Sequence, residues 1–225
     1  MDPASIIFLH LQKTGGTSLR DVIRDVYGHN PPETYTVSGT NGRKHFGNWR
    51  TLTSEQLGAD AWHDHMSFGL HKLLPQPAPY FTIVRDPVAR AVSRFCHTPT
   101  YRKNGQTPAS VYHPAWGMVY QLSGVPQNKL DRLSEEHAER ALKNLQKHFL
   151  YVGDTTRMGE LGLWLRDELG WDIELPLPHV NKAKPEIEVS EKEIEELREI
   201  RDVKLDQMLY DQICELGPYP QEWVL

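Results

Sequence analysis

Near the start of the chain stands the stretch Ile6-Ile7-Phe8-Leu9-His10-Leu11-Gln12-Lys13-Thr14-Gly15-Gly16-Thr17-Ser18-Leu19, and it decides the fold. An apolar run of strand length leads into a short loop that carries one lysine, two glycines and three hydroxyl side chains. An amphipathic helix follows, with apolar residues at the helical spacing of Leu19, Val22, Ile23 and Val26. A strand, a glycine-containing loop and a helix N-terminus together form a phosphate-binding site. Backbone N–H groups and the helix dipole attract the anion, and glycine lets the backbone approach it closely.

The loop differs from the phosphate loop of nucleotide triphosphatases. Those loops read GxxxxGK[ST], with the lysine after the glycines. Here Lys13 precedes both glycines, and no earlier glycine stands where that pattern requires one. The sequence therefore predicts a site for a phosphate-like group that is built in another way. The alternative is an ordinary strand-to-helix turn that carries a lysine.

A second strand–helix unit covers residues 80–97. Its apolar strand Tyr80-Phe81-Thr82-Ile83-Val84 ends at Arg85-Asp86-Pro87, and Asp86 and Pro87 suit the cap and first turn of the helix that follows. Arg85 thus stands at the carboxyl end of a strand, where open α/β sheets bind ligands. Ser93 follows about two helical turns later.

These two units resemble the sulfotransferases that use 3′-phosphoadenosine 5′-phosphosulfate (PAPS). QKTGGTS resembles their 5′-phosphosulfate loop, and IVRDPVARAVSRF resembles their 3′-phosphate motif. The closest group is the carbohydrate sulfotransferases, which include the heparan sulfate 2-O and 6-O enzymes and many small bacterial relatives. Weaker resemblance continues through FLYVGDTTRMGELGLWL and HVNKAKPEIEVSEKEIEEL, and so covers most of the chain.

The resemblance implies an enzyme that moves a sulfuryl group in line from PAPS to an acceptor hydroxyl, releases adenosine 3′,5′-bisphosphate and needs no metal. It implies that Lys13 contacts the oxygen between phosphorus and sulfur, and that Arg85 and Ser93 bind the 3′-phosphate. The 5′-phosphate would be held by the residues that follow the lysine, which are Thr14, Gly15, Gly16, Thr17 and Ser18. Loops similar to residues 179–185 close over the nucleotide in the family, which makes Asn181 and Lys182 further candidates.

The acceptor hydroxyl needs a base, and histidine suits that role near neutral pH. In the resembling enzymes the base is a histidine about twenty residues before the RDP arginine, and His65 stands twenty residues before Arg85. The segment MSFGLHKLL after His65 also resembles the family, although Asp64 replaces the glycine that bacterial relatives usually have there. Asp64 would orient a histidine or raise its pKa. His71 is the second candidate, and the remaining possibilities are His10, His63 and an acidic residue.

The remaining motifs give fewer candidates. His63 and His65 form a pair that could ligate a metal, but no third ligand stands at a suitable spacing, so we expect no metal site. Cys96 and Cys214 lie on apolar helix faces and are expected to be buried thiols. The net charge of −5 argues against a general nucleic-acid binder. No apolar run reaches membrane-spanning length and no secretory leader precedes the first strand, so we expect a cytoplasmic, bacterial enzyme.

The 225 residues suit one α/β domain over residues 1–225. Alternating strands and helices predict a P-loop-like, three-layer fold with a central parallel sheet flanked by helices. Beyond the two units above, we expect a loop over 29–48 with a short strand at 35–37, helices over 53–59, 109–122, 134–147 and 156–169, a strand over 149–153, loops over 98–108 and 176–185, and a long helix from Ser190.

Two other functions stay open at this point. A nucleotide-dependent kinase would need a magnesium-binding acid after a strand, and Asp154 is the one passable candidate. A non-catalytic nucleotide-binding protein would keep the loop without turnover. Residues 29–66 and 98–130 are expected to shape the acceptor site, for which a saccharide is the first choice and a glycolipid, a small phenol and a peptidyl tyrosine are alternatives.

Overall fold

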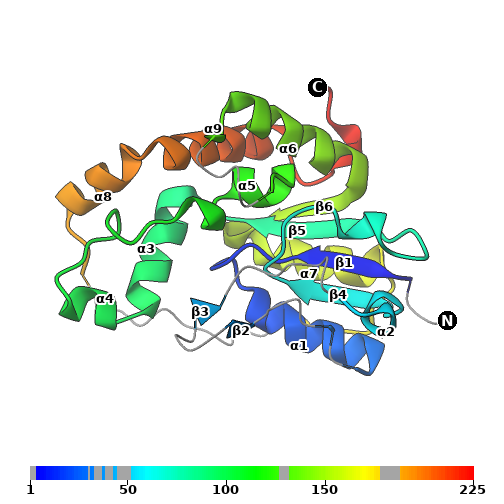
Figure 1. Cartoon of the computed structure of the whole chain (residues 1–225). Helices are drawn as coiled ribbons and strands as arrows, with labels where there is room; N and C mark the ends of the chain where they lie inside the picture. The colour runs from blue at the N-terminus through cyan, green and yellow to red at the C-terminus, as the bar shows by residue number, and fades with distance from the viewer. Residues whose placement is uncertain are drawn as a thin grey trace.

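The structure is a computed structural model, and it describes residues 4–29, 31–32, 37–38, 43–44, 52–126, 132–177 and 188–225. Its centre is a sheet of four parallel strands in the order β4-β1-β5-β6 (Figure 1). The strands are β1 (Ile6–Leu9), β4 (Ala61–Asp64), β5 (Tyr80–Val84) and β6 (Phe149–Asp154). Because all four run in the same direction, their carboxyl ends lie at one edge of the sheet.

The sheet has a topological switch point between β1 and β5. From β1 the chain moves to β4 on one side, and it then returns to β5 and continues to β6 on the other side. The register pairs Leu9 with Asp64 and Val84 with Asp154, so neighbouring strands end level with one another. Ligands of open α/β sheets bind in the crevice outside the carboxyl ends at such a point.

Helices cover both faces of the sheet (Figure 1). One face packs against α1 (Gly16–Tyr27) and α7 (Met158–Asp167), and the other against α5 (Met118–Ser123), α6 (Glu135–His148) and α9 (Arg201–Leu216). Alternation along β1 divides its side chains between the two cores: Ile6 and Phe8 join the core of α1 and α7, while Ile7 and Leu9 join the other. The predicted α/β fold, with a central parallel sheet between helical layers, is confirmed.

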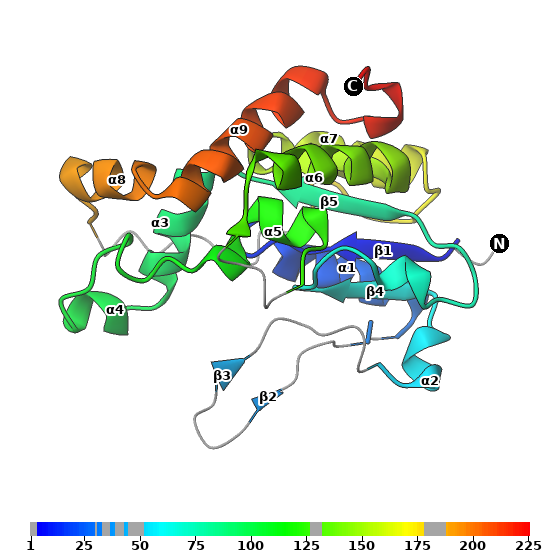
Figure 2. The same ribbon diagram turned by 45° about the horizontal axis from the view of Figure 1, so that its top comes forward.

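A helical extension lies beyond the carboxyl ends of the strands, as both views show (Figures 1 and 2). It consists of α3 (Pro87–His97), α4 (Thr100–Lys103) and α8 (Glu191–Arg198). The Arg102 guanidinium joins α4 to α8, since its Nη1 lies 2.6 Å from Oε1 of Glu193. The remaining elements are α2 (Ser54–Leu57), the two-residue strands β2 (Val37–Ser38) and β3 (Arg43–Lys44), and the 3₁₀ turns 70–72, 114–116, 155–157 and 220–222.

Several sequence-based boundaries differ from the structure. The segment 98–108 contains α4, and the expected helix over 109–122 is a 3₁₀ turn followed by α5. The expected long final helix is two helices, because Ile200 adopts an extended backbone between α8 and α9. Strand β4 was not predicted, because its sequence Ala61-Trp62-His63-Asp64 is half polar and its pairing with β1 is what makes it a strand. Among the described residues, no helix has both the length and the apolar character needed to cross a membrane.

Candidate active site

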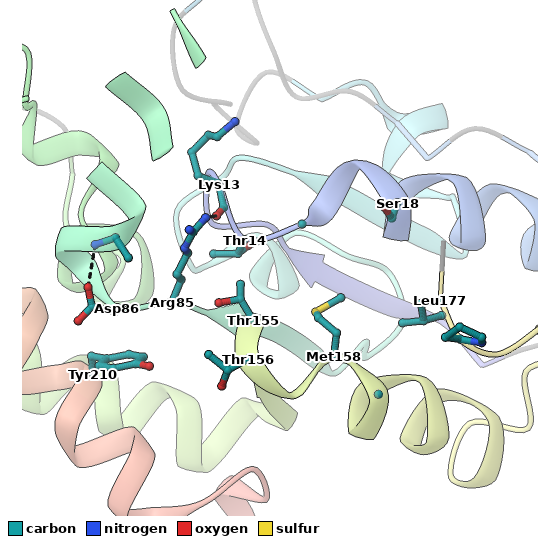
Figure 3. A pocket seen from close by; sticks show the side chains of 14 residues that line it. Lys13, Thr14, Ser18, Arg85, Asp86, Thr155, Thr156, Met158, Leu177 and Tyr210 are labelled. Carbon is teal, nitrogen blue, oxygen red and sulfur yellow. Dashed lines mark hydrogen bonds between the residues drawn. The ribbon is translucent and has the colours of Figure 1, made fainter. Parts of the chain in front are cut away.

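Each strand of the sheet delivers a candidate residue at its carboxyl end. Lys13 follows β1, His65 follows β4, Arg85 follows β5 and Thr155 follows β6. A cavity of about 510 Å³ opens at this edge, and Figure 3 shows its lining. The lining comes from the loop after β1, from the start of α3, from the start of α7 and from α9. The cavity volume lies in the range of small-molecule and cofactor sites.

The N-terminus of α1 forms one wall of this cavity through Gly15 and Ser18. Gly15 is the N-cap, with a left-handed backbone at φ 85°, and no side chain in the described part of the chain caps the helix there. The first turn of α1 also contains no acidic residue. Thr14 does not offer its hydroxyl to the cavity, because its buried Oγ1 donates to the Leu11 carbonyl at 2.7 Å. The hydrogen bond from Thr14 to Leu11 therefore stabilises the loop internally. The groups that remain to bind an anion are the backbone N–H groups at the start of α1.

Lys13 lines the cavity at the start of this loop. Its backbone is in the left-handed region at φ 66°, which side-chain-bearing residues rarely adopt. Burial, and then the nearby charges of Arg94 and Arg85, lower the pKa of Lys13. Three cationic side chains thus approach one another beside an uncapped helix N-terminus, and an anion in the cavity would relieve their mutual repulsion.

Arg85 and Lys13 meet across the switch point (Figure 3). Nη1 of Arg85 donates to the Lys13 carbonyl at 3.1 Å, which joins the end of β5 to the phosphate loop. Asp86 does not take up this guanidinium; its Oδ1 accepts the Ala89 backbone N–H at 2.7 Å and caps α3. Ser93 is half-buried on α3, one turn beyond Ala89, which lines the cavity.

His65 lies beside the phosphate loop. Its Nδ1 is 2.8 Å from the His10 carbonyl, and its ring centroid is 4.1 Å from that of His10. A carbonyl can only accept, so Nδ1 carries the proton in the neutral ring and Nε2 carries the lone pair. Oδ1 of Asp64 accepts the backbone N–H of His65 at 2.6 Å. The charge of Asp64 also acts to raise the pKa of the neighbouring His63, although burial of that ring outweighs it.

The two neighbouring histidines are buried beneath the same loop. Nε2 of His63 donates to the Gly16 carbonyl at 2.9 Å. Burial is the largest cause that lowers the pKa of His63 to about 4, and burial together with His65 and His63 holds the pKa of His10 well below its usual value. Both rings are therefore neutral near pH 7.

His71 stands at the other edge of the sheet, which the sequence did not reveal. Its Nδ1 lies 3.0 Å from the Tyr80 hydroxyl, and its ring contacts that of His148 in a tilted arrangement with 4.5 Å between centroids. Tyr80 begins β5 whereas Arg85 follows its end, a separation of roughly 16 Å along an extended strand. The structure thus brings Lys13 and Arg85 together at the cavity, places His65 against His10 just before the loop that carries Lys13, and leaves His71 apart; His65 is not among the residues that line the cavity. Asn181 and Lys182 lie outside the described residues.

Further cavity residues were missed at the sequence level. Thr155 and Thr156 directly follow β6, so the rule that selected Arg85 would have selected them. Tyr210 reaches the cavity from α9, and nothing in the local sequence indicates it (Figure 3). It donates to Oδ2 of Asp154 at 2.8 Å, while Oδ1 accepts the backbone N–H and the hydroxyl of Thr156 at 2.7 and 2.5 Å. Asp154 is thus engaged within the protein.

A second group of residues flanks Lys13 on the opposite side of α3. The Arg94 guanidinium lies 3.6 Å from the centroid of the Trp116 ring, and its Nη1 donates to Oε1 of Gln12 at 2.6 Å. Lys13 and these residues line a small hollow of their own, so Lys13 stands between two concave regions.

In the described parts of the chain, no group of three or more His, Cys, Asp or Glu side chains is arranged so that it could hold a metal ion. The two cysteines are free. Cys214 is exposed and Cys96 is only partly buried, so the expectation of two buried thiols is wrong for Cys214 and is not fully met by Cys96.

Comparison with known proteins adds one finding. The family described as "Sulfotransferase family" matches residues 2–154, which is more than half of the chain. This span begins before β1 and ends with β6, and it includes Lys13, His65, Arg85 and Ser93. A search of curated proteins found no match.

Proposed function

The chain belongs to the sulfotransferase family, whose reaction is sulfuryl transfer, and on that premise we propose that it uses PAPS as donor and a carbohydrate hydroxyl as acceptor. One observation carries the proposal: Lys13, the uncapped N-terminus of α1 and Arg85 converge on a single cavity at the switch point. Such a convergence suits a ligand with two separate anionic groups, as PAPS has at its 5′ and 3′ positions.

The donor would lie across the carboxyl edge of the sheet. The 5′-phosphosulfate would accept N–H donors from residues 14–17, because the Ser18 N–H already donates to the Gly15 carbonyl, and the 3′-phosphate would meet the planar fork of Arg85 and the hydroxyl of Ser93. The nucleoside would occupy the less charged part of the cavity, where Met158 and Leu177 lie (Figure 3).

The reaction is an in-line displacement at sulfur. The acceptor oxygen forms a bond to sulfur while the bond from sulfur to the bridging phosphate oxygen breaks, and adenosine 3′,5′-bisphosphate leaves. Lys13 would stabilise the negative charge that develops on that oxygen. His65 would take the proton of the acceptor hydroxyl at Nε2, because its Nδ1–H donates to the His10 carbonyl.

A carbohydrate acceptor is supported by the resemblance of the sequence to the carbohydrate sulfotransferases. The Arg94 guanidinium covers one face of the Trp116 ring near Lys13, at 3.6 Å from the ring centroid, so that face is not a surface on which a sugar would stack.

The test is calorimetric titration with adenosine 3′,5′-bisphosphate, ATP and 5′-AMP, each without magnesium, followed by a titration of ATP with magnesium. We expect the bisphosphate to bind at least about tenfold more tightly than 5′-AMP, because the 3′-phosphate adds charge-assisted hydrogen bonds. Turnover of PAPS with glycan acceptors would follow. Magnesium-dependent ATP binding without bisphosphate binding would instead support a kinase, which the engagement of Asp154 by Thr156 and Tyr210 disfavours. Bisphosphate binding without turnover on any acceptor would support a non-catalytic protein.

A further inference from the structure

Three imidazole rings form a contiguous group beneath the phosphate loop. The ring of His10 lies in the middle, with centroids 4.1 Å from His65 and 5.0 Å from His63. Phe8 stacks on His10 at 5.5 Å, and His10 is only 7% exposed. The His10 ring is thus packed against three other rings and is almost fully buried.

The same ring presses against the backbone of Gly16. A methyl group built on Gly16 would overlap the imidazole of His10, and the three atoms nearest to that position are its Nε2, Cδ2 and Cε1. Gly16 begins α1 and has no positive φ that would itself demand glycine. The close approach of His10 is therefore the reason that this position needs glycine.

His10 also holds His65 through its main chain. Its carbonyl accepts the Nδ1–H of His65 at 2.8 Å, and its own N–H donates to the Asp64 carbonyl at 3.0 Å. One residue thus contacts the phosphate loop with its ring and the proposed base with both its ring and its carbonyl.

We propose that His10 is a positioning residue that sets the distance between the phosphate loop and His65, with its buried ring acting as the spacer against Gly16. This inference rests on the proposed function, in which the loop holds the donor phosphate and His65 takes the acceptor proton. In-line transfer requires the donor phosphate and His65 to be held at a fixed distance and orientation. A displacement of about 1 Å can lower the rate by about 100-fold.

The experiment is a double-substitution cycle of Gly16→Ala and His10→Ala, measured by thermal unfolding, bisphosphate affinity and turnover. Gly16→Ala alone should weaken bisphosphate binding by about tenfold or more, because the new methyl group overlaps a buried ring. His10→Ala removes that ring. The double variant should therefore bind the bisphosphate about tenfold more tightly than the Gly16→Ala variant, and it should unfold at a higher temperature than the Gly16→Ala variant. His10→Ala alone should lower turnover by a larger factor than bisphosphate affinity, because His65 loses its ring support.

Gly15→Ala supplies the matched control. Gly15 needs glycine because of its φ of 85°, and the atom nearest to a methyl group there is in Met158 rather than His10. His10→Ala should therefore give no rescue of Gly15→Ala. His148→Ala, which removes a half-buried imidazole at the opposite edge of the sheet, controls for the general loss of a histidine ring and should leave bisphosphate affinity unchanged.

The results separate this inference from the proposed function. Failure of the unsubstituted chain to bind the bisphosphate would overturn the proposed function, whereas the unfolding temperatures of the four cycle members test the contact between His10 and Gly16 without any nucleotide. Equal effects of Gly16→Ala with and without His10 would overturn the spacer role. A His10→Ala variant that unfolds earlier but keeps its affinity and turnover would show a role in stability alone, and would also overturn it.

Discussion

At the scale of single residues, Lys13 combines an unusual backbone with the central charge of the site. It is the one non-glycine residue with positive φ in the described part of the chain. For an ordinary L-residue the left-handed conformation costs roughly 1–2 kcal/mol. The hydrogen bond from Arg85 to the Lys13 carbonyl helps to hold that conformation, which places the lysine side chain beside the cavity.

Replacement of Lys13 should separate turnover from binding. We expect Lys13→Ala to lower turnover by about 100-fold or more, because the developing charge on the leaving oxygen loses its cation. Bisphosphate affinity should fall less. Lys13→Gly should be equally impaired but more stable than Lys13→Ala by roughly 1 kcal/mol, since glycine accepts positive φ without strain. Urea unfolding and steady-state kinetics of both variants measure these effects, and normal turnover in either would contradict the role of Lys13.

Arg85 should act mainly on the 3′-phosphate. Arg85→Ala is expected to weaken bisphosphate binding by roughly tenfold to 100-fold, the worth of charge-assisted hydrogen bonds. Arg85→Lys should recover part of that loss, because it restores the charge without the planar fork. Titration with 5′-AMP is the control: it lacks the 3′-phosphate, so its affinity should change little. An equal loss for both nucleotides would indicate that Arg85 acts through the Lys13 carbonyl instead.

His65 should act on the proton and not on the nucleotide. We expect His65→Ala to lower turnover by about 100-fold or more while bisphosphate affinity stays nearly unchanged. His71→Ala is the matched substitution, because this residue lies at the opposite edge of the sheet. Turnover assays beside calorimetry compare the two. Full activity of His65→Ala would exclude it as the base.

At the scale of elements, a buried ion pair joins α9 to the helices around the site. Nη2 of Arg90 on α3 lies 2.8 Å from Oδ2 of Asp206, and the two side chains are 4% and 1% exposed. Asp206 also accepts the backbone N–H groups of Met118 and Val119 at 2.9 Å, and Arg90 donates to the Trp116 carbonyl. After the break at Ile200, α9 thus places Asp206 against both α3 and α5.

Removal of this carboxylate should be costly. Asp206→Ala leaves the Arg90 charge buried without its partner, for which about 3–5 kcal/mol of unfolding free energy is the expected loss. For a chain of this size the melting temperature should fall by roughly 10 °C. Lys204→Ala on the same helix removes an exposed pair with Glu199 and should cost at most about 1 kcal/mol. Similar melting temperatures for the two variants would show that the buried pair contributes little.

At the scale of the whole molecule, the buried histidines make stability depend on pH. Burial lowers the pKa of His63 from 6.5 to about 4, so the folded chain binds fewer protons than the unfolded chain between these values. The free energy of unfolding should therefore be highest above about pH 6.5 and should fall as the pH is lowered toward 4. The buried ring of His10 acts in the same direction.

Urea unfolding at pH 7 and pH 5 measures this dependence. His63→Gln keeps a donor for the Gly16 carbonyl but does not titrate, so it isolates the contribution of one ring. The stability lost between the two pH values should be smaller in His63→Gln by on the order of 2 kcal/mol. The same loss in both proteins would mean that His63 is protonated in the folded state.

Local sequence was sufficient wherever a pattern and its consequence lie within one strand–loop–helix unit. The sequence predicted β1, the loop that follows it and α1 from an apolar run, then Lys13 and two glycines, then an amphipathic helix. This was possible because the spacing of apolar residues and the residue types of a turn act over only a few positions. The same reasoning placed Arg85 after β5 and Asp86 at the cap of α3, and two such units predicted a parallel sheet between helices.

Features that depend on contacts between distant segments could not be predicted from local patterns. The half-polar strand β4 exists through its register with β1, and that register carries His65 to the phosphate loop, while Tyr80 keeps His71 at the other edge. Tyr210 likewise enters the cavity because the buried pair of Asp206 and Arg90 docks α9. Local patterns in the sequence were enough for the fold class, for the loop between β1 and α1 and for the family resemblance. The folded chain decided which histidine meets that loop, because pairing register and buried packing join residues that no local pattern connects.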